Sequence, residues 1–206
     1  MKIIRVFEKL ILLLILGLVA PILGALIFWF GADLCLPEQY VPWFALSGLL
    51  LGVVLDLVLL KRIARNAYRL DYRFWVALYL FYTIGIFGMF MGVPVVNALL
   101  AIPAGFVVGG KLSAENSDFP GVRRTAIRTA WFTTTVLTLI CIASAVIALL
   151  DPYTAGNLQG MFGLKFPVTS SMIYALILVG GVFLLAFNWI LTVISVRFSF
   201  TFLQRK

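Results

Sequence analysis

The sequence predicts an all-α integral membrane protein with six transmembrane helices. Of its 206 residues, 63% are hydrophobic and only 12% are charged, whereas about a quarter of a typical soluble domain is charged. The apolar residues form runs close in length to the ~20 residues that cross a ~30 Å hydrocarbon core. Basic residues occupy alternate connections between these runs. Together these patterns predict one transmembrane domain over residues 1–206.

The first predicted span is a retained helix. It is longer than the apolar region of a secretory signal peptide, and no clear cleavage site follows it. Pro21 lies at its centre, and Phe28-Trp29-Phe30 ends it in the manner of an aromatic membrane interface. The six predicted spans cover residues 10–30, 44–60, 74–92, 94–110, 129–150 and 172–196.

The fourth span has an unusual composition for a membrane helix. Residues 92–110 contain two prolines, four glycines and Asn97. Only Val93 and Pro94 separate this span from the third. We therefore expect spans three and four to form a tight antiparallel hairpin, and span four to be short and broken.

The basic residues predict the orientation of the chain. Fifteen of the 16 Lys and Arg residues fall in the N-terminal segment, residues 61–73, residues 111–128 and the C-terminal tail, and only Lys165 falls on the other side. Basic residues of short loops collect on the cytoplasmic side. We therefore expect both termini in the cytoplasm. The net charge of +8 then reflects topology and contact with anionic lipid, at about 1 kcal/mol per basic residue.

The composition argues against several function classes. A nucleic-acid partner needs a soluble basic surface, so we expect none. The chain has no His, and Asp56 is the one carboxylate that we place inside a span. Ser-His dyads, HExxH zinc sites, bis-His haem sites and aspartyl dyads therefore lack their residues. We expect no metal, no cofactor and no enzyme activity.

Pro21 and Pro103 suggest a binding site at the membrane midplane. Pro21 and Pro103 lie near the middles of spans one and four, where each leaves the carbonyl four residues earlier without its helical donor. The two spans hold corresponding places in the two three-span halves and run in opposite directions. This pattern is typical of 3+3 inverted-repeat transporters with broken helices. The alternative is that both prolines are simple kinks whose backbone groups are satisfied locally.

Asp56 is a second candidate for function. An ionisable side chain in a span suggests a proton relay, a cation site or a contact with substrate. Its depth is only about 6–8 Å from the cytoplasmic boundary. An ion pair with Lys61 or Arg62 is therefore the competing interpretation.

Neutral polar side chains within the spans complete the candidate binding site. Amides facing lipid would be unsatisfied, so Asn97 and Asn188 are expected to face inward. The threonines of span five form stripes at i, i+4 spacing, which line a polar path or bond within the helix bundle. The predicted substrate-binding set is Pro21, Asp56, Tyr82, Asn97, Pro103, Thr138 and Asn188.

Two kinds of surface are predicted to meet other molecules. Small-xxx-small spacings occur in four places and allow helices to approach closely, within the chain or with partner membrane subunits. The basic cytoplasmic segments are expected to contact anionic lipid. That second set is Lys61, Arg62, Arg65, Arg69, Arg124 and Arg128.

These features favour a small transporter, or the membrane-embedded solute-binding subunit of a transport system. Two alternatives stay open: a non-catalytic subunit or scaffold of a larger membrane complex, and a lipid-handling protein. For each, we expect the plasma membrane of a bacterium or an archaeon. The sequence names no substrate.

Overall fold

A computed structural model describes residues 2–90, 92–163 and 165–204, with the backbone alone for residues 2–5, 7, 61, 65, 161 and 162. Within these residues, all regular structure is helical. Six helical segments are long and apolar enough to cross a membrane, which confirms the all-α class and six helices of spanning length and composition. They are Glu8–Cys35, Glu38–Leu60, Tyr72–Met89, Val95–Ala114, Phe119–Leu150 and Ser170–Gln204.

Several helices extend beyond the apolar runs that predicted them. The largest difference is at the fifth span, which was predicted to begin at residue 129. Its helix begins at Phe119 instead. The Asp118 carboxylate caps this start by accepting from the Gly121 amide at 3.1 Å, which satisfies one of the free N–H groups of a helix end. The helix thus starts at a polar cap, ahead of the apolar run.

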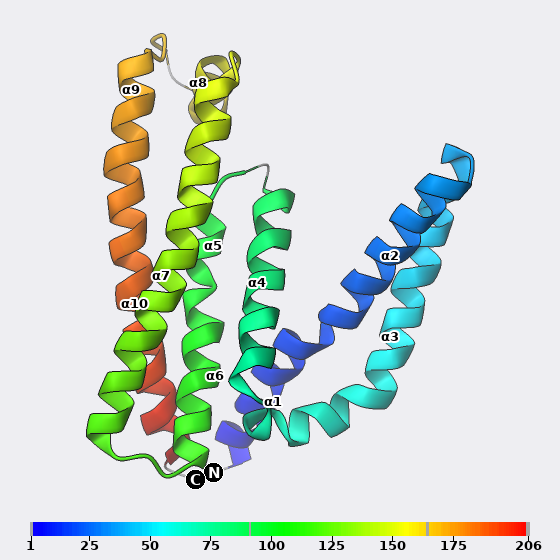
Figure 1. Cartoon of the computed structure of the whole chain (residues 1–206), viewed down its shortest axis with the longest axis vertical. Helices are drawn as coiled ribbons and strands as arrows, with labels where there is room; N and C mark the ends of the chain where they lie inside the picture. The colour runs from blue at the N-terminus through cyan, green and yellow to red at the C-terminus, as the bar shows by residue number, and fades with distance from the viewer. Residues whose placement is uncertain (1, 91, 164, 205–206) are drawn as a thin grey trace. The chain divides into compact units, whose positions relative to one another are not determined.

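The chain divides into two compact units, residues 1–70 and residues 71–204. The first unit contains the first two spans, and the second contains the other four. The first unit consists of α1 (Lys2–Gly17), α2 (Val19–Cys35), α3 (Val41–Arg65) and the short 3-10 turns Glu38–Tyr40 and Ala67–Arg69. Helices α2 and α3 lie side by side as a hairpin (Figure 1).

Glycines hold the α2–α3 hairpin together. A Cβ at Gly24 would overlap the Gly48 carbonyl, and a Cβ at Gly48 would overlap the Gly24 carbonyl. One turn further along, a Cβ at Gly52 would lie 2.5 Å from the Pro21 Cα atom. The backbones are therefore in direct contact, as small-xxx-small pairs allow. The Ala20/Gly24 motif and the Gly48/Gly52 motif pack against each other.

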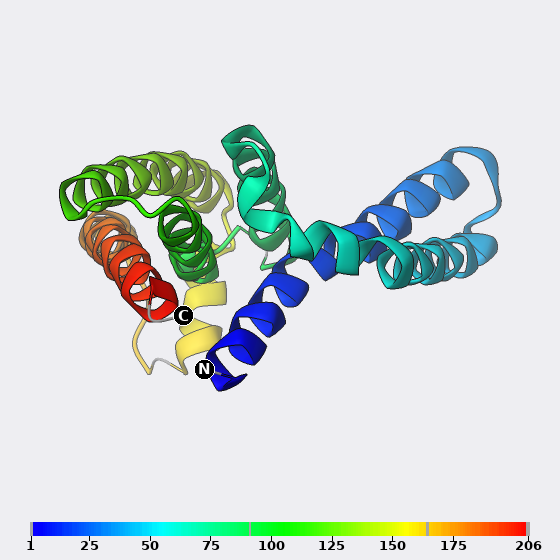
Figure 2. The same ribbon diagram turned by 90° about the horizontal axis from the view of Figure 1, so that it is seen from below.

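The second unit contains the remaining helices. It is made of α4 (Tyr72–Met89), α5 (Val95–Leu99), α6 (Ala101–Ala114), α7 (Phe119–Leu150), α8 (Thr154–Phe162), α9 (Ser170–Ala175), the π-helical segment η3 (Leu176–Gly180) and α10 (Gly181–Gln204). Viewed from below, α6, α7 and α10 stand together as a group (Figure 2).

Helices α6 and α10 make the closest contact of this group. A Cβ at Gly109 would overlap the Val196 carbonyl and lie 3.0 Å from the Phe200 amide nitrogen. A Cβ at Gly105 would lie 2.5 Å from the Ser195 Cβ. The Ser199 hydroxyl crosses the same interface and donates to the Phe106 carbonyl at 2.8 Å. The Gly105/Gly109 motif therefore also packs against another helix of the same chain, α10.

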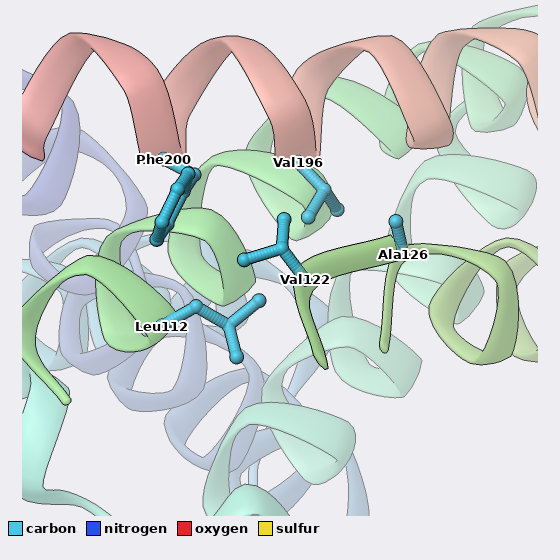
Figure 3. Close-up of a cluster of buried hydrophobic side chains, with 5 residues drawn as sticks. All are labelled: Leu112, Val122, Ala126, Val196 and Phe200. Carbon is cyan, nitrogen blue, oxygen red and sulfur yellow. The ribbon is translucent and has the colours of Figure 1, made fainter. Parts of the chain in front are cut away.

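An apolar cluster closes one end of this three-helix group. Leu112 comes from α6, Val122 and Ala126 from α7, and Val196 and Phe200 from α10. Their side chains point toward one another (Figure 3). All five are buried. The three helices thus share one apolar core.

The turn between α4 and α5 is longer than the two residues that the sequence predicts, because α4 ends at Met89 and α5 begins at Val95. The Gly92 amide donates to the Phe87 carbonyl at 2.9 Å. Gly92 has a φ of 83°, a conformation that glycine adopts far more readily than other residues. This turn brings α5 back beside α4, with which it is in contact.

Candidate functional site

The fourth span is interrupted near its middle. Helix α5 ends at Leu99 and α6 begins at Ala101. Pro103 has no N–H group, so it cannot donate to the Leu99 carbonyl four residues earlier. The Leu100 amide instead donates to the Asn97 carbonyl at 3.1 Å. Asn97 and Ala98, which come shortly before this interruption in α5, are both buried.

Asn188 of α10 connects this interruption to two other helices. Its side chain is fully buried. Its Nδ2 donates to the Ala98 carbonyl of α5 at 3.2 Å, and its Oδ1 accepts from the Thr134 hydroxyl of α7 at 3.2 Å. One turn along, the hydroxyls of Thr133 and Thr192 lie 2.9 Å apart. These bonds satisfy buried polar groups and fix α5, α7 and α10 together.

Helix α4 presents a row of polar side chains on its buried face. Trp75, Tyr79 and Thr83 follow one another at intervals of four residues, so they share one side of the helix over about 12 Å. All three are buried. The Tyr79 ring packs on Phe132 of α7, with ring centroids 5.6 Å apart. Asn97 completes the row, because its Nδ2 donates to the Thr83 carbonyl at 2.7 Å.

Three polar atoms along this row have no hydrogen-bond partner among the described residues. They are the Trp75 Nε1, the Thr83 Oγ1 and the Asn97 Oδ1. The Tyr79 hydroxyl lies beside the Thr83 side chain but does not complete a hydrogen bond with its Oγ1. Thr83 is 2% exposed and Asn97 is 1% exposed. A buried polar atom without a partner costs about 1–3 kcal/mol, so a hydrogen-bonding group placed beside this row would be stabilising.

The other polar residues predicted for this site have different surroundings. The Thr138 hydroxyl donates to the Thr134 carbonyl of its own helix at 2.8 Å. The half-buried Tyr82 packs on Phe81 with ring centroids 5.5 Å apart. Neither is a member of the row on α4. The structure therefore brings together Asn97, Asn188 and the interruption beside Pro103, and Thr138 and Tyr82 are not part of this group.

Pro21 and Asp56 belong to the first unit. Pro21 lies in the α2–α3 contact. The Asp56 Oδ2 is buried and has no hydrogen-bond partner among the described residues. The ion pair with Lys61 that we considered falls on a side chain outside the described set. Arg62, the other expected partner, has an exposed side chain.

The structure describes the side chains of four of the six residues that are predicted to contact anionic lipid. Arg62 and Arg69 in the first unit and Arg124 and Arg128 in the second have exposed side chains. Such exposure leaves their guanidinium groups free to reach phosphate groups. The side chains of Lys61 and Arg65 lie outside the described residues.

Two further features lie near the ends of the α2–α3 hairpin. An open pocket of ≈ 250 Å³ at the turn between the helices is lined by Trp29, Asp33, Glu38, Val41 and Pro42. Near the opposite end, burial and the adjacent Glu8 carboxyl raise the pKa of the Tyr68 hydroxyl well above its usual range. Tyr68 therefore keeps its proton at any physiological pH.

Sequence reasoning missed Trp75 and undervalued Thr83. A tryptophan at the start of a span is usually an interfacial anchor, and Trp75 is not among the predicted site residues. The spacing of four residues from Trp75 to Tyr79 and from Tyr79 to Thr83 was visible in the sequence. Its meaning depends on α5 folding back against α4, which brings Asn97 to the same row.

Comparison with protein-family models, with curated proteins and with solved structures found no match to this chain. Among the described residues, no group of three or more His, Cys, Asp and Glu side chains could hold a metal ion.

Proposed function

We propose that the chain is a small membrane transporter, or the solute-binding membrane subunit of a transport system, and that the row on α4 binds its solute. One observation carries the proposal. The Trp75, Thr83 and Asn97 side chains place buried, unpartnered polar atoms beside an interrupted membrane helix. Interrupted helices expose polar groups in this way at the binding sites of many transporters.

The groups of the row favour a small, uncharged, polar solute. The Trp75 Nε1 is only a donor, the Asn97 Oδ1 is only an acceptor, and the Thr83 hydroxyl can be either. None of these side chains carries a charge. A solute with hydroxyl or amide groups would pair with the Thr83 hydroxyl and the Asn97 Oδ1, whereas Trp75 lies about 12 Å from Thr83 along the same face of α4. The substrate class that we propose is therefore a neutral molecule with both donors and acceptors.

The orientation of the protein is part of the proposal. Both termini lie in the cytoplasm, because the basic residues collect in the connections on that side. Spans one and four are corresponding helices of two inverted halves, each interrupted three residues before a proline, at Leu18 and Leu100. The membrane is the plasma membrane of a bacterium or an archaeon. The protein catalyses no reaction of its own.

The substitution Thr83→Val tests the solute site. It removes a hydroxyl that has no hydrogen-bond partner in the part of the chain that the structure describes, so it should leave the melting temperature unchanged or raise it slightly. Bound solute should be lost. The measurement is mass spectrometry of small molecules retained by the gently purified protein, alongside its thermal unfolding. Retention of the same solutes by T83V at wild-type levels would count against the site.

The substitution Thr133→Val is the matched control. It also removes one buried hydroxyl, but this one lies 2.9 Å from its partner Thr192. Hydrogen bonds between membrane helices contribute about 0.6–1.7 kcal/mol, so the melting temperature should fall by about 2–5 °C. Solute retention should not change. The two variants thus separate binding from stability.

The scaffold and lipid-handling alternatives remain proposals with narrower support. Three of the four small-xxx-small motifs are occupied by contacts within the chain, which leaves less surface for a partner subunit. Gly88 of the fourth motif has no heavy atom within 4 Å of an added Cβ. The exposed arginines suit lipid phosphates equally well in a transporter, so they do not favour lipid handling over transport.

A further inference from the structure

Helix α7 carries two arginines and a tryptophan in a line near its N-terminal end. Arg124 and Arg128 are exposed, and Trp131 is 63% exposed. The three residues follow one another at spacings of four and three, so they share one face of the helix. The buried residues of α7 lie on the opposite face; they are Val122, Ala126, Ala130, Thr133 and Leu137. The line therefore points away from the helices that pack against α7.

The same face of α7 continues as a mostly apolar strip. Its next members are also exposed, and they are Thr135, Leu139, Ile142 and Val146. At 3.6 residues per turn, these positions and the line of three fall within about 80° of arc. Trp131 lies about 16 Å from Ile142 along the helix axis, which is close to the ~15 Å depth of one leaflet. The face is thus charged, then aromatic, then apolar over the length of one lipid molecule.

The two guanidinium groups are available to an anion. Arg124 and Arg128 are about 6 Å apart along the axis, so their long side chains can reach one phosphate group. Within the part of the chain that the structure describes, neither forms an ion pair. Guanidinium groups bind phosphate oxygens through paired hydrogen bonds. A tryptophan ring beside them suits the depth of lipid headgroups.

We propose that this face of α7 binds one anionic phospholipid. The phosphate lies between Arg124 and Arg128, the glycerol and ester groups lie against Trp131, and an acyl chain follows the strip to Ile142. In the orientation proposed above, the lipid belongs to the cytoplasmic leaflet. The site goes beyond the proposed transport function, since it uses none of the solute row. It also differs from a general attraction to negative lipid, because it holds a lipid at one defined position.

The test uses a chain in which Trp131 is the single tryptophan. Phenylalanine replaces the other four, which are Trp29, Trp43, Trp75 and Trp189. The protein is reconstituted in phosphatidylcholine vesicles that contain phosphatidylglycerol or phosphatidylcholine with brominated acyl chains. Bromine quenches the fluorescence of an indole that it contacts, so the two series give the relative affinity for the two lipids.

Phosphatidylglycerol should be preferred by about 5- to 25-fold, since each basic residue near anionic lipid contributes about fivefold. The double substitution R124Q/R128Q should reduce this ratio to about one. Arg123→Gln is the matched control. It removes the same charge from the adjacent exposed position, about 100° around the helix, so it should keep most of the preference.

Three results would overturn the lipid site. They are equal quenching by the two lipids, a full preference that survives in R124Q/R128Q, and no quenching by either lipid, which would mean that protein covers this face. If the chain with four phenylalanines fails to fold, native mass spectrometry of the wild-type protein with equal concentrations of both lipids decides the question. One retained phosphatidylglycerol per chain is expected, and equal retention of the two lipids would reject the site.

Discussion

Gly109→Ala should lower the melting temperature by about 6–12 °C. The added methyl group would overlap the Val196 carbonyl and approach the Phe200 amide nitrogen of α10. Overpacking costs up to about 3 kcal/mol or more, and the upper end applies because the obstructing atoms are backbone. For a chain of this size, 1 kcal/mol corresponds to about 2–4 °C. Thermal unfolding in detergent, followed by tryptophan fluorescence, measures the shift.

Gly88→Ala is the matched control for this substitution. Gly88 also lies in a membrane helix, but no heavy atom would come within 4 Å of its added Cβ. Alanine forms helices more readily than glycine, so the melting temperature should stay the same or rise. If G109A and G88A unfolded at the same temperature, α6 and α10 would not be in backbone contact.

Gly48→Ala should open the α2–α3 hairpin. Its Cβ would overlap the Gly24 carbonyl and lie 2.7 Å from the Phe28 Cβ. Because the obstruction is again backbone, we expect a cost of about 3 kcal/mol. Amide hydrogen exchange should become faster in α2 and α3. Exchange in α6 and α10 should not change, because these helices belong to the other compact unit.

Gly31→Ala provides the reference for the hairpin. Gly31 is in α2, and nothing lies within 4 Å of its added Cβ. Its exchange pattern should match that of the wild-type protein. Equal protection of α2 and α3 in G48A and G31A would show that the hairpin does not depend on the glycine contact.

Hydropathy was sufficient to predict the helical class and the six spans, because only helices of this length satisfy their backbone in lipid. It was not sufficient to place the helix ends. Residues 119–128 contain three arginines and are part of the helix. Charged side chains end an apolar run, but Arg is a good helix former. The Asp118 cap, not the start of the apolar run, sets the beginning of α7.

Of the candidate site, only the burial of the two asparagine side chains, whose exposure to lipid would be most unfavourable, was predictable from the sequence. Asn97 and Asn188 were expected to face inward because a lipid-facing amide has no partner, and both are buried. Their partners depend on which helices lie side by side, and spacing along one helix does not contain that information. The same limit applies to the glycine motifs. The sequence shows four of them, and the tertiary contacts decide that Gly24 meets Gly48 while Gly109 meets Val196.

Access of water to the α4 row decides between a solute path and a purely structural cluster. The measurement is the reaction of single cysteines with a charged, membrane-impermeant thiol reagent, in a background with Cys35 and Cys141 replaced by Ser. Thr83→Cys and Asn97→Cys report on the row. Ile84→Cys is the lipid-facing control, since Ile84 is 68% exposed on the same helix. Tyr153→Cys, 75% exposed outside the spans, is the control for free reaction.

A solute path requires that water reaches the row, and a thiol in contact with water ionises and reacts. Cysteines at positions 83 and 97 should therefore be labelled far faster than the cysteine at position 84, although more slowly than the one at position 153. Labelling at positions 83 and 97 that is as slow as at position 84 would contradict the proposed transport function.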